Sequence, residues 1–129
     1  MVTVPDTKAD VLIVDDEPDV CWALDHILKA NTIASVTVTN GREALRLASR
    51  HQFHLVFVDA KLPDLDGLDL AVLIREADAR VRIVMVSGYF YCDDPEVRQA
   101  LAAGVISGFI SKPFQHEEVL TIARETVAR

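Results

Sequence analysis

The segment Val11-Leu-Ile-Val-Asp-Asp-Glu-Pro18 decides the fold of this chain. Its four apolar residues, Val11–Val14, form a short continuous run, which is typical of a strand buried on both faces. Asp15 and Asp16 follow the run directly, and Pro18 suits the first turn of a helix. The segment therefore predicts one βα unit, made of a buried parallel strand, an acidic turn and a helix.

Similar apolar runs recur along the chain, and each precedes a stretch with helical periodicity. The expected strands are Val11–Val14, Ser35–Thr39, Leu55–Val58, Arg82–Val86 and Gly108–Ile110. This alternation predicts the α/β class, with a doubly wound, flavodoxin-like (βα)5 fold. The expected sheet is parallel and five-stranded, in the order 2-1-3-4-5.

Residues that commonly cap helices mark the helix boundaries. Asn40, with Glu43 three residues later, resembles a capping box; Asp94 before Pro95 is a start signal, and Gly104 is a stop signal. Apolar residues at helical spacing predict the core-facing positions. These positions are Val20, Ala23, Leu24, Ile27, Leu28, Ala44, Leu45, Leu47, Ala48, Leu70, Leu73, Ile74, Ala77, Val119, Ile122, Ala123 and Val127.

The composition fits one domain, because half of the 129 residues are apolar and can fill a single core. We expect residues 1–9 to form a flexible tail and residues 10–129 to form the domain. No run is long enough for a membrane span or a signal core, so we expect a cytoplasmic protein without membrane contact. The net charge of −7 argues against direct binding of nucleic acid, and Cys21 and Cys92 lack the spacing of a zinc site.

Polar residues stand at the ends of four expected strands. Ligands of doubly wound folds bind at the carboxyl ends of the strands, so Asp15, Asp16, Asp59, Ser87 and Lys112 are expected to share one rim. A strand-ending Asp is often only a helix cap, but three carboxylates that approach one another repel unless a cation neutralises them. Oxygen ligands favour Mg²⁺ or Mn²⁺, and the hydroxyl and ammonium groups would attract an anion such as a phosphoryl group.

Four separated segments resemble, in order, the signature segments of bacterial two-component response-regulator receiver domains of the chemotaxis-regulator type. They are residues 11–18, residues 59–67 (DAKLPDLDG), the pair Ser87-Gly88 and residues 109–113 (FISKP). The resemblance spans nearly the whole chain. It implies a signalling domain that accepts a phosphoryl group and that, although not an enzyme in the ordinary sense, catalyses its own phosphorylation and slow dephosphorylation.

The resemblance also implies roles for the acidic residues. Asp59 would be the phosphoacceptor. The metal ion would be bound by Asp16, Asp59 and the backbone carbonyl of Lys61, while Asp15 would hold it through water. The cofactor would be Mg²⁺ or Mn²⁺, in agreement with the oxygen donors themselves.

Three further residues would carry the catalytic contacts and the switch. By resemblance, Lys112 contacts the phosphoryl oxygens, Ser87 is the hydroxyl that moves onto them, and Phe109 is the aromatic switch residue. The Lys112–Pro113 peptide bond would be cis. Phosphorylation would thereby change the surface formed by the last two helices and the strand between them.

The partners implied are a sensor histidine kinase or a histidine phosphotransfer protein as donor, and an unidentified downstream protein or effector domain as target. A second copy of the domain, bound in a phosphorylation-dependent dimer, is a further partner considered. The loop 89–94 is about three residues longer than is usual in the family. Within it, Tyr89 is expected to cover the phosphorylation site, and an exposed aromatic side chain is a candidate anchor for a partner.

Two alternatives remain at this point. A phosphohydrolase of the haloacid-dehalogenase type also combines an Asp nucleophile, Mg²⁺, a hydroxyl and a Lys, but it needs a DxD pair where this chain has adjacent Asp15 and Asp16. A pseudo-receiver would bind partners without phosphorylation, and it usually lacks an acidic or Lys residue that is present here.

Overall fold

Strands and helices alternate along residues 9–88 and 93–127, which are the residues described by the structure, a computed structural model. The elements are β1 (Val11–Val14), α1 (Pro18–Ala30), β2 (Ser35–Val38), α2 (Gly41–Arg50), β3 (Leu55–Asp59), α3 (Gly67–Ala77), β4 (Arg82–Ser87), α4 (Pro95–Ala102), β5 (Gly108–Ser111) and α5 (His116–Val127). The strands are parallel and lie in the order β2-β1-β3-β4-β5. The predicted flavodoxin-like α/β fold is confirmed.

The central strand, β3, contributes to both sides of the core. It pairs with β1 on one side and with β4 on the other, and all of its residues are buried. Leu55 and Phe57 belong to one core cluster, whereas Val56 and Val58 belong to the other. This division follows from the two-residue period of side chains along a strand.

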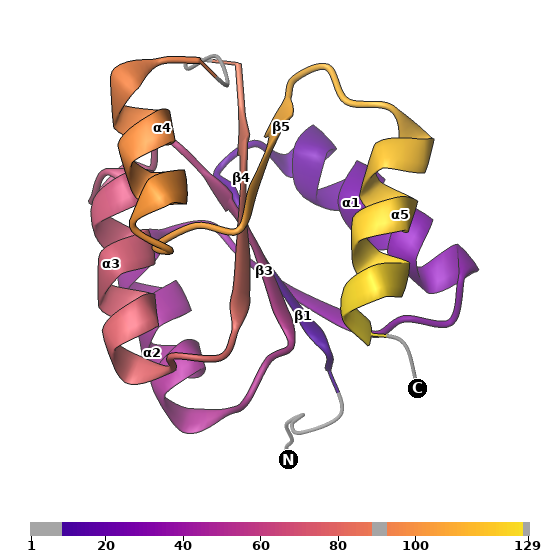
Figure 1. The fold of residues 1–129 in the computed structure, drawn as a ribbon. Helices are drawn as coiled ribbons and strands as arrows, with labels where there is room; N and C mark the ends of the chain where they lie inside the picture. Colours follow the sequence, from indigo (N-terminus) through magenta and orange to yellow (C-terminus); the bar gives the residue numbers. More distant parts are fainter. Residues whose placement is uncertain (1–8, 89–92, 128–129) are drawn as a thin grey trace.

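Helices cover both faces of the sheet (Figure 1). Helices α1 and α5 pack together on one face, where Leu28 and Ala123 are fully buried. Helices α2, α3 and α4 cover the opposite face through residues such as Ala44, Ile74 and Val97. Because both faces are covered, the carboxyl ends of the strands are the part of the sheet where polar side chains can meet a ligand.

The helix boundaries follow the predicted signals. The Asn40 side chain accepts a hydrogen bond from the backbone N–H of Glu43 at 2.9 Å, which caps α2. Pro18 and Pro95 stand in the first turns of α1 and α4. Gly104, just beyond α4, has a φ of 77°, a left-handed conformation that glycine adopts without steric cost.

Two helices bury different residues from those predicted. Leu73 and Ala77 were expected in the core, but Leu73 is 38% exposed and Ala77 is exposed as well, because the sheet-facing side of α3 is formed by Leu70, Ala71 and Ile74. Cys21 of α1 was not among the expected core residues, and it is buried.

Strand ends also differ by one residue from the prediction. Strands β3, β4 and β5 extend to Asp59, Ser87 and Ser111, whereas β2 ends at Val38. Asp59 and Ser87 are therefore held by the backbone pairing of the sheet and not by a loop.

No helix within the described ranges is long and apolar enough to cross a bilayer. The predicted tail lies, apart from Ala9, outside the described residues, and so do Tyr89, Phe90 and Tyr91 of the long loop.

Candidate functional site

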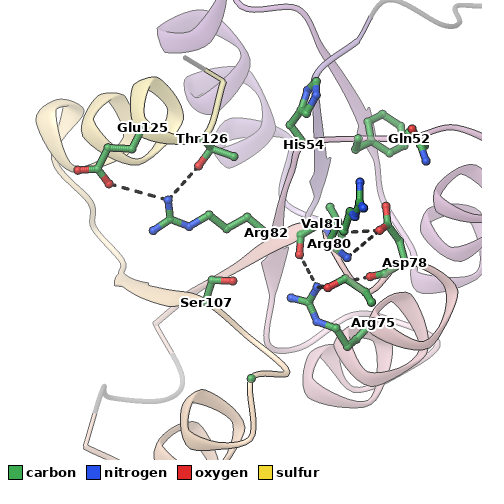
Figure 2. Close-up of a pocket in the computed structure, with 13 residues that line it drawn as sticks. Gln52, His54, Arg75, Asp78, Arg80, Val81, Arg82, Ser107, Glu125 and Thr126 are labelled. Carbon is green, nitrogen blue, oxygen red and sulfur yellow. Dashed lines mark hydrogen bonds and ion pairs between the residues drawn. The ribbon is translucent and has the colours of Figure 1, made fainter. Parts of the chain in front are cut away.

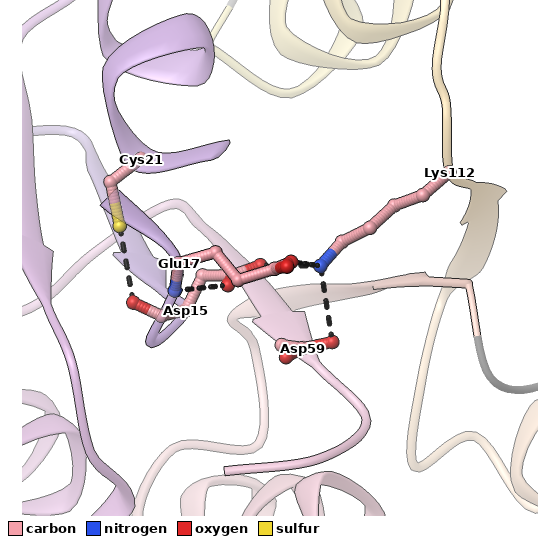
Figure 3. A network of polar contacts seen from close by, with 5 residues as sticks. All are labelled: Asp15, Glu17, Cys21, Asp59 and Lys112. Atoms are coloured by element: carbon pink, nitrogen blue, oxygen red, sulfur yellow. Dashed lines mark hydrogen bonds and ion pairs between the residues drawn. The ribbon is translucent and has the colours of Figure 1, made fainter. Parts of the chain in front are cut away.

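Four strands bring a polar side chain to the same edge of the sheet. Asp59 and Ser87 end β3 and β4, Asp15 follows β1, and Lys112 follows β5. The backbone N–H of Lys112 donates to the carbonyl of Ser87 at 3.0 Å, which fixes the start of the loop after β5. Figure 3 shows the carboxylates of Asp15, Glu17 and Asp59 around the end of the Lys112 side chain. The residues expected at one rim do lie together.

Lys112 is the cation of this cluster. Its Nζ lies 2.8 Å from Glu17 Oε1, 3.0 Å from Asp15 Oδ2 and 3.4 Å from Asp59 Oδ1. Glu17, to which the sequence analysis assigned no role, thus makes the shortest of the three contacts. Its pairing with Lys112 joins residues that are 95 positions apart, so no local sequence pattern signals it.

Three aspartates form an acidic group beside Lys112. Asp15, Asp16 and Asp59 each offer a carboxylate oxygen within 4.8 Å of the others. Asp15 and Asp59 are 1% and 7% exposed, whereas Asp16 is exposed. The group therefore combines two desolvated carboxylates with one that faces solvent.

Burial sets the protonation behaviour of the cluster. It raises the pKa of Asp59 to about 6, and the charge of Asp15 adds to this effect while Lys112 opposes it. Burial raises the pKa of Asp15 as well. For Lys112, burial alone would lower the pKa, but the hydrogen bond with Glu17, the close contact with Asp15 and the charges of Asp15 and Asp59 outweigh it, so the pKa is raised. Lys112 is therefore charged at neutral pH, and one cation faces several carboxylates.

The oxygens of this group suit a hard divalent cation. Asp15 Oδ2 is buried and has no hydrogen bond within the described residues, although Lys112 Nζ stands 3.0 Å away as an ion-pair partner. A buried carboxylate oxygen of this kind is costly unless a charge or a donor satisfies it. Carboxylate oxygens without His or Cys fit Mg²⁺ or Mn²⁺ better than zinc. The residues present therefore fit the expected ion.

The turn after β1 is held by hydrogen bonds of Asp15 itself. Asp15 Oδ1 accepts from the backbone N–H of Glu17 at 2.9 Å, and its carbonyl accepts from Cys21 Sγ at 3.2 Å. Burial raises the pKa of the Cys21 thiol to about 11, so it remains a protonated donor. Cys21 thus supports the acidic turn, a function that its sequence position does not signal.

The loop after β3 is tied to its surroundings at both ends. The backbone N–H of Gly67 donates to the carbonyl of Ala60 at 2.8 Å, and Lys61 pairs with Asp66 in an isolated bridge. Asp64 accepts hydrogen bonds from the first backbone N–H groups of α2, including that of Gly41 at 2.8 Å. The segment that follows Asp59 is therefore anchored to a second helix, through a contact that no local sequence pattern predicts.

The structure also describes the surroundings of Ser87, Phe109 and Pro113, which the resemblance singled out. Ser87 is completely buried at the end of β4. Phe109 is partly buried and packs against the core cluster beneath α2, α3 and α4. The Lys112–Pro113 peptide bond is cis.

A different concave region of about 640 Å³ lies away from these residues, around the start of β4 (Figure 2). Arg75 extends across it and donates to the carbonyls of Ala79 at 3.1 Å and Val105 at 3.3 Å, among others. Arg82 donates to the Thr126 hydroxyl at 3.2 Å. Because these two arginines join secondary-structure elements, we assign the chemistry to the opposite edge.

Comparison with known families gives a consistent result. The model of the response regulator receiver domain family matches residues 11–124. Chemotaxis protein CheY of Bacillus subtilis is 33% identical over 118 residues, which cover 91% of this chain and 96% of that protein.

Other relatives are longer. Response regulator protein PilR of Pseudomonas aeruginosa is 35% identical over 107 residues, which cover 83% of this chain but only 23% of PilR. Among solved structures, the receiver domain of a sensor histidine kinase from Pseudomonas aeruginosa was obtained with a magnesium ion coordinated in its active-site cleft. It matches this chain with a TM-score of 0.80 at 22% identity, covering 95% of this chain and 100% of that one.

Proposed function

This chain belongs to the response regulator receiver domain family. We propose that in the cytoplasm it takes a phosphoryl group onto Asp59 from a phosphohistidine of a sensor histidine kinase or a histidine phosphotransfer protein, with Mg²⁺ as cofactor. Small phosphodonors would serve as substitutes. The observation that carries the proposal is the convergence of Asp15, Asp16 and Asp59 on one point, with Lys112 Nζ 3.4 Å from Asp59 Oδ1. Neither the phosphohydrolase nor the pseudo-receiver alternative is favoured by the family match.

The transfer requires Asp59 as its nucleophile. A carboxylate oxygen of Asp59 forms a bond to phosphorus while the bond between phosphorus and the donor nitrogen breaks, and the electron pair of that bond returns to the donor ring. Because Asp59 ends the central strand and is held by pairing with β4, its carboxylate is positioned before the donor arrives. Such positioning removes part of the entropic barrier to transfer.

Lys112 would stabilise the charge that accumulates on the transferred group. Its ammonium lies within reach of Asp59 and its side chain is only 16% exposed, so its interaction with phosphoryl oxygens would be weakly screened. Asp15, Asp16, Asp59 and the carbonyl of Lys61 are the groups that would hold Mg²⁺. When bound, the ion supplies a positive charge that neutralises the carboxylates and polarises the phosphoryl oxygens.

The switch would involve Ser87 and Phe109. A phosphorylated Asp59 carries about two negative charges at neutral pH, which attract the Ser87 hydroxyl. The space vacated by that movement would allow Phe109 to rotate on β5, so that the surface of α4, β5 and α5 changes between two states. This surface would bind the downstream protein, the effector domain or a second phosphorylated copy.

The test is phosphorylation of the purified chain with acetyl phosphate and Mg²⁺, followed by intact-mass spectrometry. We expect one added phosphoryl group in the parent, and none after Asp59→Asn or in the presence of a chelator. Ser49→Ala, a substitution at the end of α2, serves as a control for handling. An unmodified parent mass would contradict the proposed function.

A further inference from the structure

Glu17 occupies a position where it competes for the cation of the site. Its Oε1 lies 2.8 Å from Lys112 Nζ, which is closer than either aspartate oxygen. The Glu17 side chain is 60% exposed, whereas those of Asp15 and Asp59 are 2% and 10% exposed. Glu17 is therefore the partner of Lys112 that can move into solvent without loss of packing.

The Glu17 carboxylate has no other structural task among the described residues. It stands at the N-cap position of α1, but its side chain makes no capping hydrogen bond. Its backbone N–H is already satisfied by Asp15 Oδ1. The geometry thus directs this carboxylate to Lys112 and not to the helix.

We propose that Glu17 is a positioning residue that restrains Lys112 in the unphosphorylated protein and so slows phosphorylation of Asp59. This inference rests on the proposed function. An ammonium group has three N–H donors, and all three directions are drawn toward carboxylates here. An incoming phosphoryl group must therefore displace one of these carboxylates from Lys112. Glu17 is the exposed partner and the one to be displaced, and because its contact is the shortest, breaking that contact slows the reaction.

Removing Glu17 has two consequences, both of which would raise the rate of phosphorylation, so the variants must separate them. Loss of the contact frees Lys112, and loss of the charge reduces repulsion of an anionic donor. Glu17→Gln removes the charge and with it the ion pair, whereas Glu17→Asp keeps the charge but shortens the side chain by one methylene. The aspartate variant therefore weakens the contact while preserving the field at the rim.

The experiment measures the rate of phosphorylation by acetyl phosphate at several donor concentrations, with saturating Mg²⁺. We expect both Glu17→Gln and Glu17→Asp to react about two- to fivefold faster than the parent, a range set by the usual strength of a partly exposed ion pair. Asp19→Asn is the matched control, because Asp19 is an exposed acid in the first turn of the same helix. It should react at the parental rate.

A second background tests whether Glu17 acts through Lys112. In a Lys112→Gln chain, which will react more slowly, Glu17→Asp should have no additional effect, since effects on one shared contact are not additive. Mg²⁺ affinity, measured by calorimetry, should be equal in the parent and in Glu17→Asp.

Three results would overturn the inference. If only Glu17→Gln accelerates the reaction, the effect is general charge repulsion. If Glu17→Asp weakens Mg²⁺ binding and slows the reaction, Glu17 belongs to the metal site. If neither variant changes the rate while the parent is phosphorylated normally, Glu17 does not restrain Lys112; a parent that is never phosphorylated would instead contradict the proposed function itself.

Discussion

Gly67 approaches the backbone of Asp59 so closely that a β-carbon at position 67 would lie 2.1 Å from the carbonyl oxygen of Asp59. Atoms that are not bonded do not come so near, so any larger residue must push the two segments apart. The start of α3 is thus in direct contact with the strand end that carries the proposed phosphoacceptor. The position admits glycine because of close packing and not because of an unusual backbone angle.

We predict that Gly67→Ala lowers the free energy of unfolding by about 1–3 kcal/mol, the usual cost of an inserted methyl group in a packed region. It should also slow phosphorylation, because it displaces the Asp59 backbone. Urea denaturation and the acetyl phosphate assay measure the two effects. Gly108→Ala is the control, since its β-carbon would meet Val84 at an ordinary 3.7 Å. Equal stability of the two variants would contradict the steric argument.

The stability of the metal-free protein should depend on the protonation of Asp59. Its pKa rises from 3.8 to about 6 on folding, so the folded state binds this proton more tightly than the unfolded state. The resulting stabilisation is complete below about pH 4 and is lost as the pH rises through about 6. In chelator, Asp59→Asn should therefore be more stable than the parent at about pH 8, and the difference should shrink or reverse near pH 4. A pH-independent difference in urea midpoint would contradict the assigned direction.

Removing one exposed acid should separate metal binding from folding. We predict that Asp16→Asn weakens Mg²⁺ binding by about tenfold or more, as expected for loss of a metal-supporting group. Because Asp16 is exposed and belongs to a repelling cluster, the metal-free variant should be at least as stable as the parent. Calorimetric titration with Mg²⁺ and thermal unfolding are the measurements. A variant that unfolds, or that binds Mg²⁺ as the parent does, would identify Asp16 as a structural residue.

Arg75 should matter for stability and not for chemistry. Its guanidinium donates to the carbonyls of Asp78, Ala79 and Val81 before β4 and to that of Val105 before β5. We predict that Arg75→Met lowers the free energy of unfolding by about 2 kcal/mol or more, because hydrogen bonds to charged groups contribute more than neutral ones.

Phosphorylation of the folded Arg75→Met variant at low temperature should proceed at the parental rate. Arg80→Met, which removes an exposed neighbouring arginine, is the matched control. If Arg75→Met lowered the free energy of unfolding no more than Arg80→Met does, the prediction would be wrong, and the carbonyls bound by Arg75 would have to find other donors.

The fold could be predicted because each strand carries its own signal. The run Val11–Val14 is apolar at every position, since both faces of the sheet are covered, and Pro18 and Asn40 mark helix starts locally. Asp15, Asp16 and Asp59 could be placed at one edge because a parallel sheet aligns its strand ends. Each of these inferences uses information contained within a few neighbouring residues.

Contacts between distant segments could not be predicted. The pairing of Glu17 with Lys112 depends on how α1 and the loop after β5 approach each other in space. Asp64 caps a helix that precedes it by more than twenty residues, and an aspartate in a loop has no local feature that identifies such a partner. The exposure of Leu73 depends on the rotation of α3 about its axis. The spacing of apolar residues in the sequence predicts this rotation only to within about one residue position, so it does not decide whether Leu73 faces the sheet.

The central position of β3 has a consequence for hydrogen exchange. Its amides are paired between β1 and β4 and shielded by both cores, so they should exchange with solvent through the largest openings of the structure. Strand β5 has a neighbour only on the β4 side, and its amides should exchange sooner. Asp59 is thus carried by a slowly opening strand and Lys112 by the end of an edge strand. The proposed phosphoacceptor, Asp59, should therefore keep its position when a ligand arrives, and Lys112 should be the residue that moves.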